Sequence, residues 1–292
     1  MKKRINGLII YNKEDIDKNL FFCDHIIETG REYGLNIKLV LNDRPYREIM
    51  TDNISFVINR SRDHLISAFF EEKNIRVFNS SFVSKTANDK ILTYDHLKKH
   101  GIGSLPFISF SIKDPLYNIK TLAEDLDLPL VLKPSCGHGG DRVCLIKAWN
   151  ELKDNLSLFA KTGKYDRYIL QKCASDTGKD LRVYVLGGRI VKAMLRENTS
   201  SLDIRANFSL GGNASVHEMT FEEKNLVQSI IRIFPSDFTG IDLIYDKGHP
   251  VFNEIEDAVG CRMLYKYTDI DIIKELINYI LCQSDKFNSK QL

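Results

Sequence analysis

Two glycine-centred hairpin patterns in the second half of the chain restrict its fold more than any other feature. In each, two apolar runs of strand length flank a pair of residues that contains glycine, which readily adopts the positive φ angles of a tight hairpin turn. The runs are residues 181–186 and 189–195 around Gly187–Gly188, and residues 240–245 and 250–257 around Lys247–Gly248. The sequence therefore predicts antiparallel sheet in this half.

The first 80 residues follow a different pattern, in which short apolar runs alternate with helical spacing. Strands are predicted at residues 5–11, 37–41, 55–58 and 75–78, and helices at residues 21–33 and 62–73. This β-α-β-β-α-β order is typical of a small open α/β domain, because the helices can cover the faces of the sheet.

The remaining segments mix helices and strands. Residues 102–111, which contain Pro106, open a second region. Further helices are predicted at residues 89–100, 150–161, 221–234 and 270–281, and further strands at residues 130–133, 142–147 and 168–171. A chain of 292 residues is long enough for about two domains. We therefore expect an α/β fold with an α+β C-terminal half.

The charge balance argues against nucleic acid as a partner. The chain has 41 Lys and Arg residues and 39 Asp and Glu residues, a net charge of +2, whereas nucleic-acid binders usually carry a basic excess or stripe. The longest stretch without these four residue types has 13 residues, which is shorter than the roughly 20 apolar residues of a membrane-spanning helix. We expect no nucleic-acid partner and no membrane span.

The cysteines and the N-terminus indicate the compartment. The six cysteines form no C-x-x-C pair and have no zinc-ligand spacing. The start, MKKRINGLIIY, has only a short apolar run before Lys13 and is typical of a first strand rather than a signal peptide. Because scattered cysteines without a targeting segment are typical of a reducing environment, we expect a cytoplasmic protein.

Three carboxylates in the last hairpin form the strongest chemical pattern. With Gly248 at the centre of the turn, Asp242 lies opposite Glu254, and Glu254 shares a face with Glu256 because strand side chains alternate. Like charges opposed across strands repel each other, and a cation would offset this cost. Hard oxygen ligands suit Mg²⁺. The alternative is an exposed acidic sheet face, but the neighbouring positions are too apolar for a fully solvated hairpin.

A glycine-rich segment, Lys133-Pro134-Ser135-Cys136-Gly137-His138-Gly139-Gly140, connects two predicted strands. Three glycines in four residues let the backbone approach a ligand and offer N–H groups to phosphate, and Lys133 can supply a positive charge. The segment is not a Walker loop, because no G-K-[ST] follows. The alternatives are a plain hairpin turn and a solvated His138.

Two further groups are less specific. The first contains Arg182, Arg196, Arg205 and Asn207, followed by Gly211–Gly212. Arginine makes bidentate contacts to phosphate or carboxylate, but ordinary ion pairs are the alternative. The second is Asp89-Lys90 at a predicted helix start. Here Asp89 can cap the helix and Lys90 can be solvent-exposed.

In order along the chain, these segments resemble the ATP-grasp superfamily, and within it the RimK-like carboxylate–amine ligases. The resemblance runs from about residue 5 to about residue 280. Each segment is weak by itself, whereas the ordered series is specific. The series is Asn79, Asp89-Lys90, Lys133-Pro134 with its glycine-rich loop, Gln171, Asp180-Leu181-Arg182-Val183, Gly187-Gly188, Arg205-Ala206-Asn207, Gly211-Gly212, Gly240-Ile241-Asp242 and Glu254-Ile255-Glu256.

The resemblance implies an ATP-grasp fold preceded by an open α/β domain. Residues 1–84 would form the N-terminal pre-ATP-grasp domain, and residues 85–292 would form the ATP-grasp domain. Within the latter, the central lid subdomain would cover about residues 104–170 and the C-terminal subdomain about residues 171–292.

The resemblance also implies a role for each matching residue. The expected ATP-binding residues are Lys90 and Lys133 at the phosphates, Gly137, His138, Gly139 and Gly140 in a mobile loop over them, Gln171, Lys172 and Cys173 in the hinge that reads adenine, and Asp180 near the ribose. The candidate catalytic residues are Arg205 and Asn207, around the transferred phosphate, and Arg182 of the D-x-R motif. The expected ligands of Mg²⁺, with Mn²⁺ as a second candidate, are Asp242, Glu254 and Glu256.

The chain departs from the family pattern at the last metal ligand. Glu256 stands where the family usually has Asn, and Asp257-Ala258-Val259-Gly260 follows in place of a turn with Ser or Pro. Glutamate still offers oxygen but adds a negative charge, which Arg262 could offset.

The implied activity is ATP-dependent carboxylate–amine ligation through an acyl phosphate, with release of ADP and phosphate. The resemblance implies an amino acid, peptide or carrier-protein substrate, and relatives often form homo-oligomers. Two alternatives stay open. An ATP-grasp phosphotransferase would release a stable phosphorylated product, and a nucleotide-binding pseudo-enzyme would bind ATP without turnover.

Overall fold

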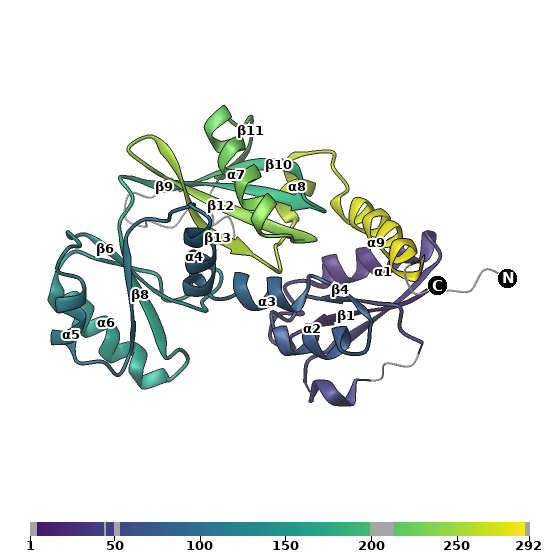
Figure 1. The fold of residues 1–292 in the computed structure, drawn as a ribbon, viewed down its shortest axis with the longest axis horizontal. Helices are drawn as coiled ribbons and strands as arrows, with labels where there is room; N and C mark the ends of the chain where they lie inside the picture. The colour runs from purple at the N-terminus through teal and green to yellow at the C-terminus, as the bar shows by residue number, and fades with distance from the viewer. Residues whose placement is uncertain (1–4, 44, 50–52, 199–212, 290–292) are drawn as a thin grey trace.

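The computed structural model describes residues 5–43, 45–49, 53–198 and 213–289, and these residues contain three sheets (Figure 1). A parallel sheet lies at one end of the molecule and an antiparallel sheet at the other, and a second antiparallel sheet bridges them. No helix in the described ranges combines the length and the apolar character needed to cross a membrane. The predicted α/β fold class with an α+β C-terminal half is confirmed.

The N-terminal sheet is parallel, with strand order β2-β1-β3-β4. Its strands are β1 (Ile5–Tyr11), β2 (Leu35–Leu41), β3 (Phe56–Asn59) and β4 (Arg76–Phe78), and a short 3₁₀ helix, η1 (Tyr46–Glu48), precedes β3. Strand β1 alternates between two cores: Ile9 packs with α1 (Leu20–Glu32), and Leu8 and Ile10 pack with α2 (His64–Glu71). Helices therefore cover both faces, as the predicted open α/β arrangement requires.

The central sheet is antiparallel, with strand order β5-β8-β6-β7. Its strands are β5 (Phe107–Ser111), β6 (Leu130–Pro134), β7 (Cys144–Ile146) and β8 (Arg167–Lys172). Helices α5 (Leu116–Leu122) and α6 (Trp149–Thr162) pack on it through the buried Ile119, Leu152 and Phe159. The glycine-rich segment connects β6 to β7. The domain and subdomain boundaries given above stay predictions.

The bridging sheet is also antiparallel, with strand order β11-β10-β9-β12-β13. Its strands are β9 (Asp176–Leu186), β10 (Arg189–Glu197), β11 (Asn213–His217), β12 (Phe238–Asp246) and β13 (His249–Glu256). Both predicted hairpins are present. Helices α3 (Ser81–Ala87), α4 (Lys90–Lys99) and α7 (Phe221–Ile233) pack with one side of this sheet, and α8 (Arg262–Tyr267) and α9 (Ile272–Ser289) pack with the other.

Six elements were not predicted from the sequence: α3, α5, α8, β5, β11 and η1. Each has seven residues or fewer, so none contains enough turns or alternations for a periodic pattern. Local contacts define them instead. For example, the Ser80 hydroxyl caps α3 by accepting from the Val83 N–H at 3.4 Å.

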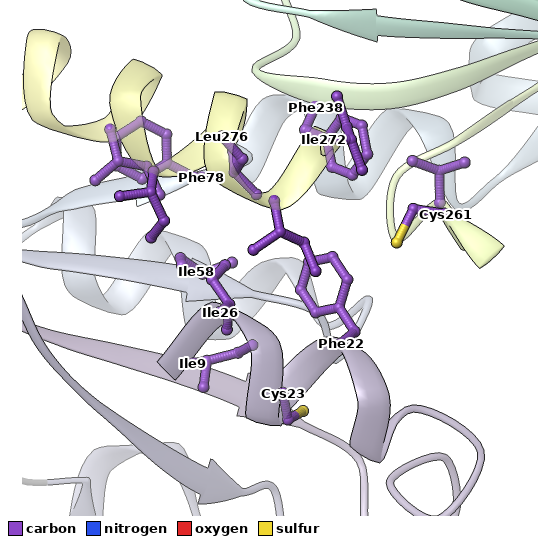
Figure 2. Close-up of a cluster of buried hydrophobic side chains, with 14 of the residues drawn as sticks. Ile9, Phe22, Cys23, Ile26, Ile58, Phe78, Phe238, Cys261, Ile272 and Leu276 are labelled. Atoms are coloured by element: carbon purple, nitrogen blue, oxygen red, sulfur yellow. The ribbon is translucent and has the colours of Figure 1, made fainter. Parts of the chain in front are cut away.

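The N-terminal sheet and the end of the chain share one hydrophobic core. Phe22 and Ile26 of α1 and Ile58 of β3 pack in the same cluster as Ile272 and Leu276 of α9 (Figure 2). All five side chains are buried. Helix α9 therefore connects the N-terminal sheet to the bridging sheet.

Asn79, just after β4, adds a polar link between the same two parts of the molecule. Its Oδ1 accepts from the backbone N–H of Asp237 at 2.7 Å and of Phe238 at 3.0 Å. Its Nδ2 donates to the Phe238 carbonyl and to Asp257 Oδ1, each at 2.8 Å. Asn79 thus holds the start of β12 and the loop after β13 against the end of β4.

Candidate active site

The hairpin of β12 and β13 positions the three predicted metal ligands. Its turn is Lys247–Gly248, because Asp246 pairs with His249, and strict pairing outward from this turn would place Asp242 opposite Asn253. A bulge inserts Asn253 as an extra residue, so Asp242 pairs with Glu254 instead. The predicted pairing of Asp242 with Glu254 is therefore present, but its cause is the bulge and not the position of the turn.

Carboxylate oxygens of Asp242, Glu254 and Glu256 lie within 4.8 Å of one another. Asp242 is buried, and the other two are half-buried. Asp242 Oδ2 accepts two hydrogen bonds, whereas Oδ1 accepts one and keeps a lone pair for a cation. Three hard oxygen donors at this spacing fit Mg²⁺ or Mn²⁺.

Two arginines neutralise the buried end of this cluster. Arg182 binds Asp242 in a bidentate contact, with Nε–Oδ1 at 2.8 Å and Nη2–Oδ2 at 2.6 Å, and Arg196 Nη2 reaches the same Oδ2 at 2.8 Å. Burial raises the pKa of Asp242, but the two guanidinium groups outweigh it and lower the pKa to about 2. Arg196 also binds Asp180, at 2.5 and 2.8 Å. Asp242 is therefore ionised at neutral pH.

Glu256 has its charge partner within the sheet. Its Oε1 lies 2.9 Å from Arg182 Nη2. The sequence suggested Arg262 for this role; Arg262 does line a pocket with Glu256, but the ion pair that the structure records is with Arg182. Strand pairing explains the difference. Arg182 lies opposite Asp242 on the neighbouring strand, and its guanidinium group contacts the carboxylates of both Asp242 and Glu256.

Lys90 joins the helix α4 to this cluster. Asp89 caps the helix by accepting from the Ile91 N–H at 2.9 Å, but the Lys90 side chain is only 11% exposed, so the solvent-exposed alternative is wrong. Its Nζ lies 3.1 Å from Glu254 Oε2 and donates to the Gly137 carbonyl at 2.8 Å. Burial lowers the pKa of Lys90, but Glu254 outweighs it and raises the pKa above its ordinary value.

Lys133 lies near the end of β6, and a carboxylate offsets the burial of its charge less than it does for Lys90. Its buried Nζ lies 3.2 Å from both the Tyr94 hydroxyl and Asn253 Oδ1. Burial and the nearby Lys90 lower the pKa of Lys133 to about 7, and Glu254 only partly opposes them. Among the residues that the structure describes, the buried Lys133 amine has no direct anionic partner, and it would gain from one. Sequence reasoning missed Tyr94 and Asn253, and the one-residue bulge that positions Asn253 leaves no pattern in the sequence.

The glycine-rich segment lies beside both lysines. Gly139 and Gly140 have positive φ angles of 61° and 77°, which glycine adopts without steric cost. The His138 side chain is exposed and also lines the second pocket, where desolvation, together with Arg62 and Lys90, lowers the pKa of its ring to about 4. His138 is therefore neutral at physiological pH.

A first pocket lies between the central and bridging sheets. The two lysines, Glu254 and Asp180 line one part of it, and the predicted hinge lines another, with Val131, Val143 and Ile244 as apolar walls. In the predicted hinge, the Gln171 side-chain amide is already engaged, since its Nε2 donates to the Leu105 carbonyl at 3.0 Å. The Lys172 ammonium binds Asp246 at 3.0 Å, and the Cys173 N–H donates to the Pro129 carbonyl at 3.3 Å.

A second pocket shares part of this lining. Lys90, Glu254 and the glycines 137, 139 and 140 line both pockets. The second pocket is completed by Asp15, Lys18 and Arg62 of the N-terminal domain and by Glu256, Asp257 and Arg262 of the C-terminal half. The two pockets therefore adjoin at Lys90 and Glu254.

Most of the predicted site residues lie together around these two pockets. Lys90, Lys133, residues 137–140, residues 171–173, Asp180 and Glu254 line one or both pockets, and Arg182 and Asp242 lie directly behind them. The predicted catalytic residues Arg205 and Asn207, and Gly211–Gly212 after them, lie outside the described residues.

This fold and site define a class of protein, the ATP-grasp ligases. The RimK-like ATP-grasp domain matches residues 87–280, and the chain belongs to this family. The resemblance stated from the sequence is thus confirmed, as is the expectation of a ligase.

Individual relatives support the assignment. The chain is 30% identical to an uncharacterized protein of Mycoplasma pneumoniae over 268 residues. The aligned region covers 90% of this chain and 88% of that protein. It is 28% identical over 286 residues to a probable alpha-L-glutamate ligase of Maridesulfovibrio salexigens, covering 90% and 92%. The D-alanine–D-alanine ligase of Bacillus anthracis in complex with ATP has a similar structure, with a TM-score of 0.78, 14% identity, and coverage of 99% and 100%. At this identity, the last comparison shows the fold alone.

Proposed function

We propose that the chain activates a substrate carboxylate with ATP, as an acyl phosphate, and transfers the acyl group to an amine. The observation that carries the proposal is that Lys90, Glu254 and the glycine-rich segment line two pockets at once. A nucleotide in the first pocket and an acid in the second would meet at these residues. This arrangement favours phosphoryl transfer between two bound substrates.

The two lysines would neutralise the transferred phosphate. Lys90 would exchange Glu254 for a phosphate oxygen, and Lys133 would gain the anion that its buried position lacks. Asp242, Glu254 and Glu256 would hold Mg²⁺, which would offset charge on the phosphate oxygens. Electrostatic stabilisation and positioning of this kind are the main contributions that a protein makes to phosphoryl transfer.

The second half-reaction needs protection from water. An acyl phosphate hydrolyses if water reaches it before the amine does, and a closed site prevents this. Gly137, Gly139 and Gly140 border both pockets and are suited to backbone movement over the phosphates. The amine would attack the acyl carbon, phosphate would leave, and an amide would form. We propose an amino acid or a peptide as the source of the carboxylate, in line with the names of the relatives.

Product analysis tests this proposal. The chain is incubated with ATP, Mg²⁺ and a pool of amino acids and acidic peptides, with hydroxylamine as the amine. We expect ADP, phosphate and a hydroxamate, and loss of all three products in Glu254→Gln. A stable phosphorylated acid would indicate a phosphotransferase instead. AMP and pyrophosphate would contradict the mechanism, and nucleotide binding without turnover on any acid would indicate a pseudo-enzyme.

A further inference from the structure

Two neutral side chains hold the Lys133 amine in the first pocket. Its Nζ donates to the Tyr94 hydroxyl and to Asn253 Oδ1, each at 3.2 Å, and Lys133 and Tyr94 are both buried. The Tyr94 hydroxyl in turn donates to the Asn253 backbone carbonyl at 2.8 Å. Since a hydroxyl has one hydrogen, its oxygen is left to accept from the amine, and the direction of each bond is fixed. The three residues thus form a closed ring of hydrogen bonds.

Helix α4 supplies the tyrosine. Tyr94 lies four residues after Lys90 on this helix, so the two side chains project from the same face. The Tyr94 ring packs against the rings of Phe107 and Phe252, with centroids 5.0 and 5.9 Å away. Burial raises the pKa of the Tyr94 hydroxyl, which therefore stays neutral beside the amine.

The bulge in β13 supplies the asparagine. Adjacent residues of a regular strand point to opposite faces, so regular pairing would not direct both Asn253 and Glu254 to one pocket. The bulge inserts Asn253 beside Glu254, and both residues line the first pocket. The hairpin thereby presents a neutral amide to Lys133 next to the carboxylate that pairs with Lys90.

Lys133 differs from the other cations of this pocket in its partners. Five lysine and arginine side chains line the pocket among the described residues, and four of them lie within 3.6 Å of a carboxylate oxygen. Lys133 contacts only neutral groups there, although a buried charge without a charged partner is costly and here the pKa falls to about 7. Such a cost is expected where the charge serves a ligand. The four paired cations are Lys90 with Glu254, Lys172 with Asp246, Lys179 with Asp176 and Arg196 with Asp180.

We infer that Tyr94 and Asn253 are positioning residues, which hold the Lys133 amine in the first pocket with neutral groups and so keep its charge for a phosphate of the bound nucleotide. The inference rests on the proposed function only for the identity of this anion. A lysine that is already held loses less side-chain freedom when the anion binds. A carboxylate at position 253 would instead neutralise the amine, as Glu254 does for Lys90.

Double-mutant cycles test whether the two residues act through Lys133. A non-hydrolysable ATP analogue with Mg²⁺ is titrated calorimetrically into the full chain. Tyr94→Phe and Asn253→Leu should each weaken the affinity about tenfold, the typical effect of losing a hydrogen bond to a charged group. In the Lys133→Met background, the same two changes should alter the affinity less than about twofold. Additive losses in either cycle would overturn the role of that residue, because it would then act without Lys133.

Tyr184→Phe is the matched control for Tyr94→Phe. Tyr184 is also buried and donates its hydroxyl to a backbone carbonyl, that of Gly260, at 2.8 Å, but it does not line the first pocket. The change removes an equivalent hydrogen bond and should leave the affinity for the analogue within about twofold of the wild type. A loss as large as that of Tyr94→Phe would contradict the inference, since any buried hydroxyl would then have the same effect.

Asn253→Asp tests the need for a neutral partner. The carboxylate should pair with Lys133, so the affinity for the analogue should fall at least about tenfold while the melting temperature of the free chain rises by about 2 °C or more. In the Lys133→Met background the melting temperature should not rise, because the ammonium group is gone. A purely structural role predicts that stability and affinity fall together. That outcome, or an unchanged affinity, would contradict the inference.

The outcomes separate this inference from the proposed function. If the cycles show coupling to Lys133 but product analysis yields no hydroxamate, the positioning role stands and the ligase proposal fails. If hydroxamates form while the losses are additive, the ligase proposal stands and the positioning role is wrong. A wild type that does not bind the analogue would overturn the identity of the anion.

Discussion

Single charged residues of this site owe their properties to burial and to the residues that surround them. Lys90 and Lys133 both line the first pocket, yet Lys90 faces a carboxylate, whereas Lys133 contacts a hydroxyl and an amide oxygen among the described residues. Their pKa values consequently move in opposite directions. Sequence alone identifies both lysines as candidates, but it cannot show this difference, which depends on Asn253 and Tyr94.

Nucleotide binding should therefore take up a proton above neutral pH. The pKa of Lys133 is lowered to about 7 in the free protein, so the amine is mostly neutral at about pH 8, and a bound phosphate favours the charged form. We expect uptake of nearly one proton at about pH 8, little uptake at about pH 6, and weaker affinity as the pH rises between them. Calorimetry in buffers of different ionisation enthalpy measures the uptake. Lys133→Met should abolish it, and uptake that persists in this variant would contradict the assignment.

Lys90 should also control metal binding without nucleotide. Its ammonium lies 3.1 Å from Glu254 and competes with a divalent cation for that carboxylate. We expect Mn²⁺ to bind the wild type weakly until ADP is added. Lys90→Met should bind Mn²⁺ alone at least about tenfold more tightly, since removing one charge near a partly buried site is worth a few kcal/mol. Electron paramagnetic resonance of free Mn²⁺ measures this, with Lys192→Met as the control. Equal affinities in wild type and Lys90→Met would refute the competition.

The strands bring together residues that are distant in the sequence. The hairpin turns of the bridging sheet follow from glycine and from apolar runs, and the sequence predicted them correctly. The bulge at Asn253 was not predicted, because a one-residue insertion has no composition or periodicity of its own. The order of strands β10, β9 and β12, which places Arg196, Arg182 and Asp242 side by side, is likewise a result of tertiary packing.

Removing one partner of a buried ion pair on these strands should lower the free energy of unfolding. The Arg182 side chain is 7% exposed and that of Asp242 is 1% exposed, so Arg182→Leu leaves a buried carboxylate with only Arg196. We expect a loss of about 3 kcal/mol in the free energy of unfolding, as for other broken buried ion pairs. Lys192→Gln on β10 breaks an exposed pair with Glu218 and should cost less than about 1 kcal/mol. Urea denaturation compares the two, and similar losses would contradict the distinction.

At the scale of the whole molecule, the arrangement of the sheets depends on contacts between the first and last parts of the chain. The sequence predicted an α/β beginning, an α+β second half and the last helix, but it did not show that this helix packs on the N-terminal domain. Helix α9 makes this connection through the shared core (Figure 2), and Asn79 makes it through hydrogen bonds to the backbone. Contacts across such sequence separation leave no local pattern. They matter for function, because residues from both parts line the second pocket.

Truncation of a buried α9 side chain should therefore destabilise the N-terminal sheet as well as the helix. Leu276 is 2% exposed in the shared core, and Leu276→Ala should cost about 2–5 kcal/mol, as in other buried leucine truncations. Amides of β1 and β3 should lose hydrogen-exchange protection together with those of α9. Leu158→Ala on α6, where the side chain is 58% exposed, should change stability by less than about 0.5 kcal/mol. Loss of protection confined to α9 would show that the two parts unfold separately.

Transfer of oxygen from the acid to phosphate tests the central claim most directly. L-glutamate or the Glu-Glu dipeptide, labelled with oxygen-18 in its carboxylates, is incubated with the chain, ATP, Mg²⁺ and hydroxylamine, and the phosphate is examined by mass spectrometry. Attack of a carboxylate oxygen on the γ-phosphate predicts one labelled oxygen in each phosphate released, and none with Glu254→Gln, which should release no phosphate. Unlabelled phosphate formed at the rate of the hydroxamate, or label found in AMP, would contradict an acyl phosphate at this site.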